Sequence, residues 1–244
     1  MNTDKYTMDI SNLTVAVVRK DIKNLHIGVY PPDGHVKVTA PIRMDKDSIR
    51  LAVITRLDWI RKKQKAFGKQ IRESKREMIS GESHYVEGRR LRLNVIENKM
   101  RKRPVVRLKN HTILEMEIPP NTDRDERERI LERWYRRRLR EKLPLMLEKW
   151  EKKIGVHVNE VRIKKMKTKW GSCNVNAKRI WLNLELAKKP LVCLEYILVH
   201  EMVHLLERNH TERFAHLMSQ FLPNWKLIRD ELNSMPLGYA EWEY

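Results

Sequence analysis

Residues 191–210 read LVCLEYILVHEMVHLLERNH, an apolar run that carries two histidines four residues apart. Residues four apart share one face of a helix, so His200 and His204 are expected to present their imidazoles to one point. Imidazole nitrogens are common zinc ligands. Glu201 follows the first histidine directly, where its carboxylate can act as general base toward a water that the metal acidifies. The pattern predicts a catalytic centre on a helix, with Zn²⁺ as cofactor.

A catalytic zinc site uses three protein ligands, and His210 is the leading candidate for the third. It stands six residues after His204, the spacing of the HExxHxxGxxH class, although Glu207 occupies the glycine position of that class. We expect the chain to turn at Asn209, because asparagine tolerates the left-handed conformation that ends helices. The competitors for the third place are Cys173, Glu212 and Glu231.

The alternative to a metal site is a buried helix whose histidines are satisfied core residues. The helix is apolar except at these positions, and burying Glu201 without a partner would be costly. This cost favours the metal site.

The segment before this helix supplies candidates for substrate binding. Residues 179–186 (RIWLNLEL) alternate leucine and isoleucine with other residues, which is typical of a strand. Asn183 lies on it, and Trp170 and Gly171 precede it, so these three are the candidates for contacts with substrate. For Trp170 and Gly171 the competing interpretation is a tight turn packed by an aromatic ring.

The first 120 residues are expected to be rich in strands, with one helix. Strand patterns cover 13–18, 25–29 and 36–38, and Pro31 to Gly34 is a hairpin signal. A helix begins near Asp47 or Ser48, and Gly68 ends or kinks it. Three further strands, at 91–96, 105–108 and 113–118, predict a meander.

A long helix is expected from about Asp125 to Ile154. Thr122 or Asp123 can cap its start, and Gly155 is placed to cap its end. Pro144 should kink or split it. We therefore predict an α+β protein with an N-terminal region at 1–120 and a catalytic domain at 121–244.

Composition limits the classes of protein. The chain has 244 residues, of which 41% are hydrophobic, so a packed core can form. No apolar run is long enough to cross a membrane, no secretory signal is visible, and the two cysteines make no disulfide framework; we expect a cytoplasmic protein. The net charge of +19 favours a partner such as nucleic acid. The alternative is that arginines alternating with glutamates only cover solvated helix faces.

Three pieces of the chain resemble the YgjP-like metallopeptidase family, a relative of the SprT-like zinc proteases. Trp170-Gly171-Ser172-Cys173 is similar to its WGSC signature, Leu182-Asn183-Leu184 to the strand that follows, and HEMVHLLERNHTERF to its HExxH segment. The resemblance implies a zincin-like α+β fold with a small mixed sheet and His200, His204 and His210 as ligands. It also implies a rim strand, expected at Arg179–Leu186, that pairs with an extended peptide.

Together these patterns predict a zinc metallopeptidase that hydrolyses peptide bonds in protein or peptide substrates. One alternative is a nucleic-acid-associated zinc protein, with a SprT-like role on DNA-bound proteins and weak or no independent peptidase activity. Another is a zinc hydrolase that acts on a non-peptide amide. Glu201 argues against a purely structural zinc, which needs no base.

Overall fold

The computed structural model describes residues 4–30, 33–69 and 73–236. Contacts within the chain divide it into two compact units, with the division between residues 71 and 72. Each unit has its own hydrophobic core.

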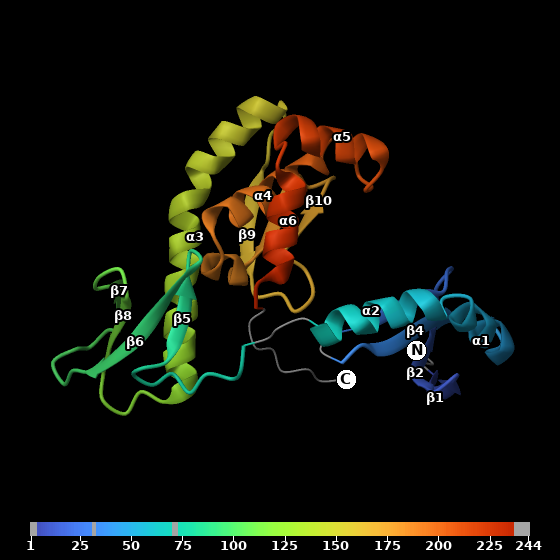
Figure 1. The fold of residues 1–244 in the computed structure, drawn as a ribbon, viewed down its shortest axis with the longest axis horizontal. Helices are drawn as coiled ribbons and strands as arrows, with labels where there is room; N and C mark the ends of the chain where they lie inside the picture. The colour runs from blue at the N-terminus through green and yellow to red at the C-terminus, as the bar shows by residue number, and fades with distance from the viewer. Residues whose placement is uncertain (1–3, 31–32, 70–72, 237–244) are drawn as a thin grey trace. The chain divides into compact units, whose positions relative to one another are not determined.

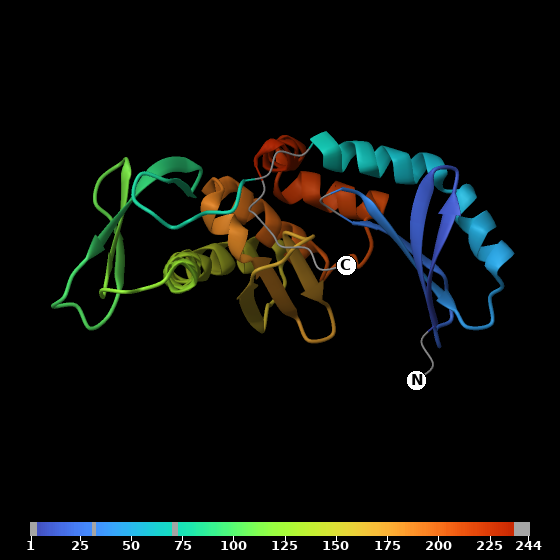
Figure 2. The ribbon, with the colours of Figure 1, turned by 90° about the horizontal axis from the view of Figure 1, so that it is seen from below.

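The first unit is a four-stranded sheet with two helices on it. The strand order is β1-β2-β4-β3, and the central pair, β2 and β4, is parallel. Alternate residues of the central strands, such as Val15, Val17, Val36 and Val38, are buried beneath the helices (Figure 2). The elements are β1 (Asp4–Ile10), β2 (Leu13–Lys20), β3 (His26–Tyr30), β4 (His35–Pro41), α1 (Lys46–Ile54) and α2 (Leu57–Lys69).

The helix predicted after residue 47 is two helices in the structure. Asp45, not Asp47 or Ser48, caps α1, because its carboxylate accepts a hydrogen bond from Ser48 N at 2.7 Å. The break falls at Thr55 and Arg56, between α1 and α2. Helix α2 runs to Lys69, one residue past Gly68, where its end or kink is predicted. Antiparallel β3 and β4 confirm the predicted hairpin, although its residues 31–32 lie outside the described residues.

The second unit begins with a sheet of the same strand order, β5-β6-β8-β7. The predicted strands are confirmed, but β6 and β8 pair in parallel, so the expected meander is wrong. A meander pairs successive strands antiparallel, whereas here the β7–β8 hairpin inserts β8 beside β6. The strands are β5 (Ser83–Val86), β6 (Arg89–Glu97), β7 (Val105–Leu108) and β8 (Ile113–Ile118).

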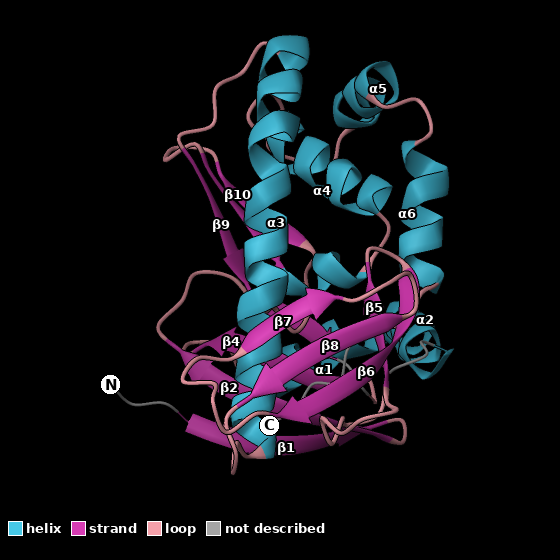
Figure 3. Ribbon diagram, turned by 90° about the vertical axis from the view of Figure 1, so that its left-hand side faces the viewer, coloured by secondary structure: helices cyan, strands magenta, loops and turns pink. Residues whose placement is uncertain are grey.

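Helix α3 (Arg124–Ile154) packs on this sheet (Figure 3). The carboxylate of Asp123 caps its start through Glu126 N at 2.7 Å, and Gly155 ends it with φ 77°, as predicted. Pro144 does not split the helix, which curves in its C-terminal half (Figure 1). Trp134 and Trp150 lie buried along its inner side.

A small mixed sheet and three helices complete the second unit. The sheet order is β10-β11-β9, with β10 antiparallel and β9 parallel to β11. Helix α4 contacts β10 and β11 as well as α3, α5 and α6, which places it at the centre of the unit. The elements are β9 (Glu160–Lys164), β10 (Gly171–Asn174), β11 (Arg179–Asn183), the 3-10 helix η1 (Leu184–Lys188), α4 (Leu191–Val203), α5 (Glu212–Phe221) and α6 (Trp225–Ser234).

This architecture confirms the predicted α+β class, including the small mixed sheet and the N-terminal hairpin-and-helix region. The boundary expected near residue 120 falls inside the second unit, because Leu91 and Met116 of the β5–β8 sheet share one core with Trp134 of α3. A catalytic domain limited to 121–244 stays a prediction. In the described part of the chain, no helix has the length and apolar character to cross a membrane.

Candidate metal centre

The end of α4 sets the position of the three histidines. The helix ends at Val203 with His204 as its cap, earlier than the turn predicted at Asn209. Glu207 N closes the turn on Val203 O at 3.0 Å, and Nδ1 of His204 lies 3.2 Å from Glu207 O. Asn209 does not have a positive φ, so its predicted left-handed conformation is wrong. The early turn lets the chain reverse and return His210 toward the helix.

The three imidazoles converge. Nε2 of His200 lies 3.0 Å from Nε2 of His210, and one ring nitrogen from each histidine lies within 4.8 Å of the others. Two nitrogens bound to one tetrahedral zinc at about 2.0–2.1 Å would be about 3.3 Å apart. The 3.0 Å between His200 and His210 is close to this value, and the wider spacings of up to 4.8 Å would shorten when an ion is bound. Because Nδ1 of His204 faces Glu207 O, Nδ1 carries the proton, and the lone pair of Nε2 can bind a metal. Within the described residues, the competitors Cys173, Glu212 and Glu231 join no such group.

Burial favours the neutral form of His200 and His204. It lowers the pKa of His200 to about 3, helped by the charges that His204 and His210 would carry, and it also lowers the pKa of His204. Nδ1 of His200 is buried without a hydrogen bond. Neutral imidazoles offer lone pairs at neutral pH, as metal ligands must.

Phe214 packs against all three histidines, a role that the sequence reasoning missed. Its ring centroid lies 5.0 Å from that of His200 and 4.7 Å from those of His204 and His210. The Thr211 hydroxyl accepts a hydrogen bond from Phe214 N at 3.3 Å, which caps α5 as predicted and fixes where this ring enters the cluster. In the sequence, the four-residue spacing between His210 and Phe214 is the feature from which this contact could have been predicted.

Glu201 follows His200 on α4 and is buried, with a relative exposure of 5%. Burial raises the pKa of its carboxyl to about 8, and the positive charge of Lys169 opposes the shift. A β-carbon placed on Gly171 would lie 2.7 Å from Oε1 of Glu201. Only a glycine therefore lets β10 pass this close to the carboxylate, which gives Gly171 of the WGSC segment a steric role.

Two other residues of the WGSC segment, Trp170 and Cys173, lie in different environments. Trp170 is half-buried, and the ammonium of Lys189 lies 5.8 Å from its ring centroid. Burial, and then the charge of Glu201, raises the pKa of the Cys173 thiol to about 11. Cys173 therefore stays protonated at neutral pH, in agreement with a packed thiol and not a metal ligand.

Asn183 is buried, and its amide binds backbone atoms of its own unit. Nδ2 donates to Met166 O at 2.9 Å and to Lys169 O at 2.7 Å, while Oδ1 accepts from Met166 N and Glu185 N at 3.2 Å. These bonds hold the loop that leads to Trp170. Direct binding of substrate by Asn183 stays a prediction.

The rim strand expected at Arg179–Leu186 is wrong. β11 (Arg179–Asn183) is the central strand, with β10 on one side and β9 on the other, and residues 184–188 form η1. Within the described residues, β10 and β9 each pair only with β11, so both strands have a free edge. β10 begins at Gly171, beside Glu201, and its free edge is therefore close to the candidate site.

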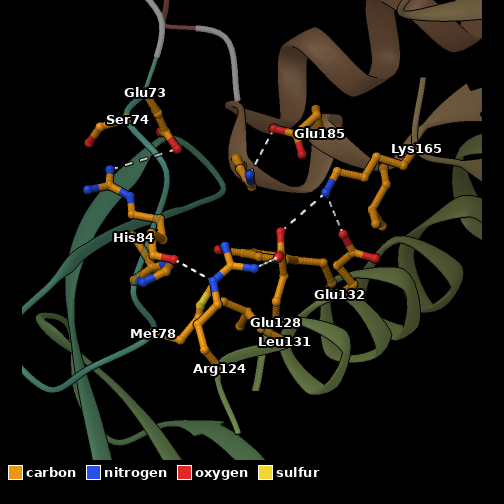
Figure 4. A pocket seen from close by; sticks show the side chains of 14 residues that line it. Glu73, Ser74, Met78, His84, Arg124, Glu128, Leu131, Glu132, Lys165 and Glu185 are labelled. Carbon is orange, nitrogen blue, oxygen red and sulfur yellow. Dashed lines mark hydrogen bonds and ion pairs between the residues drawn. The ribbon is translucent and has the colours of Figure 1, made fainter. Parts of the chain in front are cut away.

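Apart from the histidine cluster, the second unit has a pocket that is lined by charged side chains and by none of the three histidines (Figure 4). Nζ of Lys165 lies 2.7 Å from Glu132 and 3.3 Å from Glu128, and Arg124 donates to Glu128 at 2.6 Å. These cations and carboxylates neutralise one another. The network ties α3 to the segment that follows β9.

The fold and the histidine cluster together are those of a metallopeptidase domain. The chain belongs to the YgjP-like family, since the family model described as a YgjP-like metallopeptidase domain matches residues 23–235. This confirms the resemblance seen in the sequence, and membership implies a metal ion and a protein or peptide substrate.

Among solved structures, the metallopeptidase zymogen of abylysin from Pyrococcus abyssi is similar to part of the chain. The two are 24% identical, the match covers 36% of this chain and 88% of that one, and the TM-score is 0.34. No protein with a curated description matches this chain.

Proposed function

We propose that the protein is a zinc-dependent peptidase, with His200, His204 and His210 as ligands and Glu201 as general base. The observation that carries this proposal is the convergence of three imidazoles, with the buried carboxyl of Glu201 on the residue that follows His200. Three histidines match the donor set of a catalytic zinc site, which keeps a position open. A bound zinc ion would acidify water and polarise a peptide carbonyl.

The role of Glu201 is to move a proton. Its carboxylate takes a proton from the attacking water and gives it to the leaving amine. Burial raises the pKa of this carboxyl, and the charge of a bound zinc ion would act in the opposite direction and favour the carboxylate that accepts the proton. Gly171 leaves the space in which the carboxylate stands.

The free edge of β10 is the proposed place for substrate. An extended peptide that pairs with Gly171–Asn174 gains backbone hydrogen bonds whatever its side chains. Gly171 and Trp170 would then contact substrate, while Asn183 holds the loop before them. The free thiols of Cys173 and Cys193 agree with a reducing, cytoplasmic setting, which is part of the proposal.

Metal analysis and a peptide library test this function. Wild type should carry about one zinc per chain and cleave library peptides. His204→Ala should lose both the metal and cleavage, whereas Glu201→Gln should keep the metal and lose cleavage. Equal cleavage by Glu201→Gln, or wild type without affinity for zinc, would refute the proposal.

The alternative of a structural zinc in a nucleic-acid-associated protein has less support. A structural site is closed by four ligands, whereas the group of metal-ligating side chains among the described residues holds three histidines. Zinc bound by Glu201→Gln and by wild type alike, with no peptide cleaved by either, would favour that alternative.

A further inference from the structure

We propose that the first unit binds single-stranded nucleic acid on the solvent face of α2. Trp59 provides a ring on which a base stacks, and Arg56, Lys62 and Lys63 contact phosphates. These four residues are called the Trp59 cluster below. The proposal is independent of the metal centre, which lies in the second unit.

The four side chains of the cluster come from α2 and from Arg56, the residue that precedes it, and all four are exposed. Arg56 precedes Trp59 by three residues, and Lys62 and Lys63 follow it by three and four, so all three cations are its neighbours on the helix surface. Trp59 is 42% exposed, whereas Ile60, one residue on, is fully buried in the core of the unit. The arrangement puts a flat aromatic ring in solvent with positive charge around it.

The cations of the cluster are free to meet a ligand. Within the described part of the chain, no carboxylate forms an ion pair with Arg56, Lys62 or Lys63, and Asp58 is the one acidic residue of α2. Most arginines of α3 are different, because carboxylates pair with them. Both Arg129 and Arg133, for example, lie 2.8 Å from Glu126. The excess positive charge is therefore available on α2 and largely compensated on α3.

Single-stranded nucleic acid fits this surface better than other polyanions. Stacking of bases on an exposed aromatic ring, with cations along the backbone, is the general mode of single-strand binding. A helix that lies on a bilayer must turn an apolar face to the lipid. The apolar face of α2 is turned to the core of its own unit, where Ile60 is buried. The acidic side chains of a protein would pair with the cations but would not stack on Trp59, whereas a nucleic acid offers both phosphates and flat bases.

The test is a salt series of binding to a fluorescent oligothymidylate and to a duplex, using the full zinc-loaded chain. The variant Arg56→Gln/Lys62→Gln/Lys63→Gln should lower the slope of log K against log salt by about 2, since each phosphate contact on a single strand contributes about 0.7. Trp59→Ala should weaken single-strand binding about tenfold at every salt concentration, with little change for duplex, and Trp59→Phe should recover most of it.

Arg129→Gln/Arg133→Gln/Arg137→Gln on α3 is the matched control, since it removes the same charge from ion-paired positions. It should keep the wild-type slope. All variants change exposed side chains, so their thermal unfolding should match that of wild type. The proposal is overturned if wild type does not bind the oligonucleotide at low salt, if the control lowers the slope as much, or if Trp59→Ala binds like wild type. Phosphatidylserine vesicles that bind through the cluster and are not displaced by oligonucleotide would also overturn it.

Discussion

Gly171 and Glu201 stand so close that no side chain fits between them. A β-carbon at Gly171 would lie 2.7 Å from Oε1 and 2.9 Å from Cγ of Glu201, and 3.0 Å from Cγ2 of Ile197. The glycine and the glutamate are thirty residues apart in sequence and come from an edge strand and the central helix. The WGSC segment therefore matters because it leaves room for the proposed base.

The first prediction is that Gly171→Ala lowers kcat/KM about 100-fold while zinc content stays the same. The added methyl group must displace the carboxylate, and a shift of about 1 Å in a catalytic group can cost about that much. Kinetics and metal analysis of the purified variant check it. Gly68→Ala is the control, because a β-carbon there meets no atom within 4 Å. If Gly171→Ala had the kcat/KM of wild type, Gly171 would not be needed to leave room for Glu201.

The sequence predicted those features that depend on local spacing. The i, i+4 histidines, the caps at Asp123, Thr211 and Gly155, and most strands follow from short-range rules and were found in place. The convergence of His210 on His200 could be proposed from spacing, but the path of the chain could not. The turn begins at His204, where Glu207 N donates to Val203 O and Nδ1 of His204 lies next to Glu207 O. The residue types at these positions do not predict such hydrogen bonds.

Features that depend on pairing between distant segments were missed. Strands β6 and β8 carry ordinary strand patterns, and nothing local shows that they pair in parallel. The resemblance implies a rim strand at Arg179–Leu186, and no local pattern shows that β9 and β10 pair on both sides of β11. The alternation also continues through Leu184 and Leu186, although these residues belong to η1. The contacts of Phe214 and Gly171 likewise exist only in three dimensions.

The second prediction concerns Phe214. Phe214→Leu should lower zinc affinity about tenfold, because the flat ring that positions all three imidazoles is lost while the core stays apolar. Competition with a zinc-binding dye measures this affinity. Phe221→Leu, a buried position on the same helix, should lose comparable stability and keep wild-type affinity. If both variants lose affinity equally, general destabilisation explains the effect.

The third prediction separates a positioning role of Asn183 from contact with substrate. Asn183→Ala should lower the free energy of unfolding by about 2–3 kcal/mol, because the buried carbonyls of Met166 and Lys169 lose their donor. Urea denaturation measures it. Asn159→Ala, which removes an exposed amide bonded to Ala177 O, should cost about 0.5 kcal/mol or less. A variant with wild-type stability and a raised KM would instead assign Asn183 to substrate binding.

The last prediction is a loss of stability in mild acid that originates at His84. Burial, and then the positive charge of Arg76, lowers the pKa of this histidine from 6.5 to about 4, although Glu82 opposes the shift. The unfolded chain therefore takes up a proton below about pH 6.5 that the folded chain refuses until about pH 4. The free energy of unfolding should fall across this window, by about 2 kcal/mol between pH 7 and pH 5. Urea denaturation with a chelator present, so that metal release does not contribute, measures the loss. Between pH 7 and pH 5, His84→Leu should lose about 2 kcal/mol less than wild type, because His200, His204 and Glu201 titrate alike in both proteins. His216→Leu, at an exposed position of α5, should follow wild type. A His84→Leu curve parallel to that of wild type would place the acid sensitivity elsewhere in the molecule.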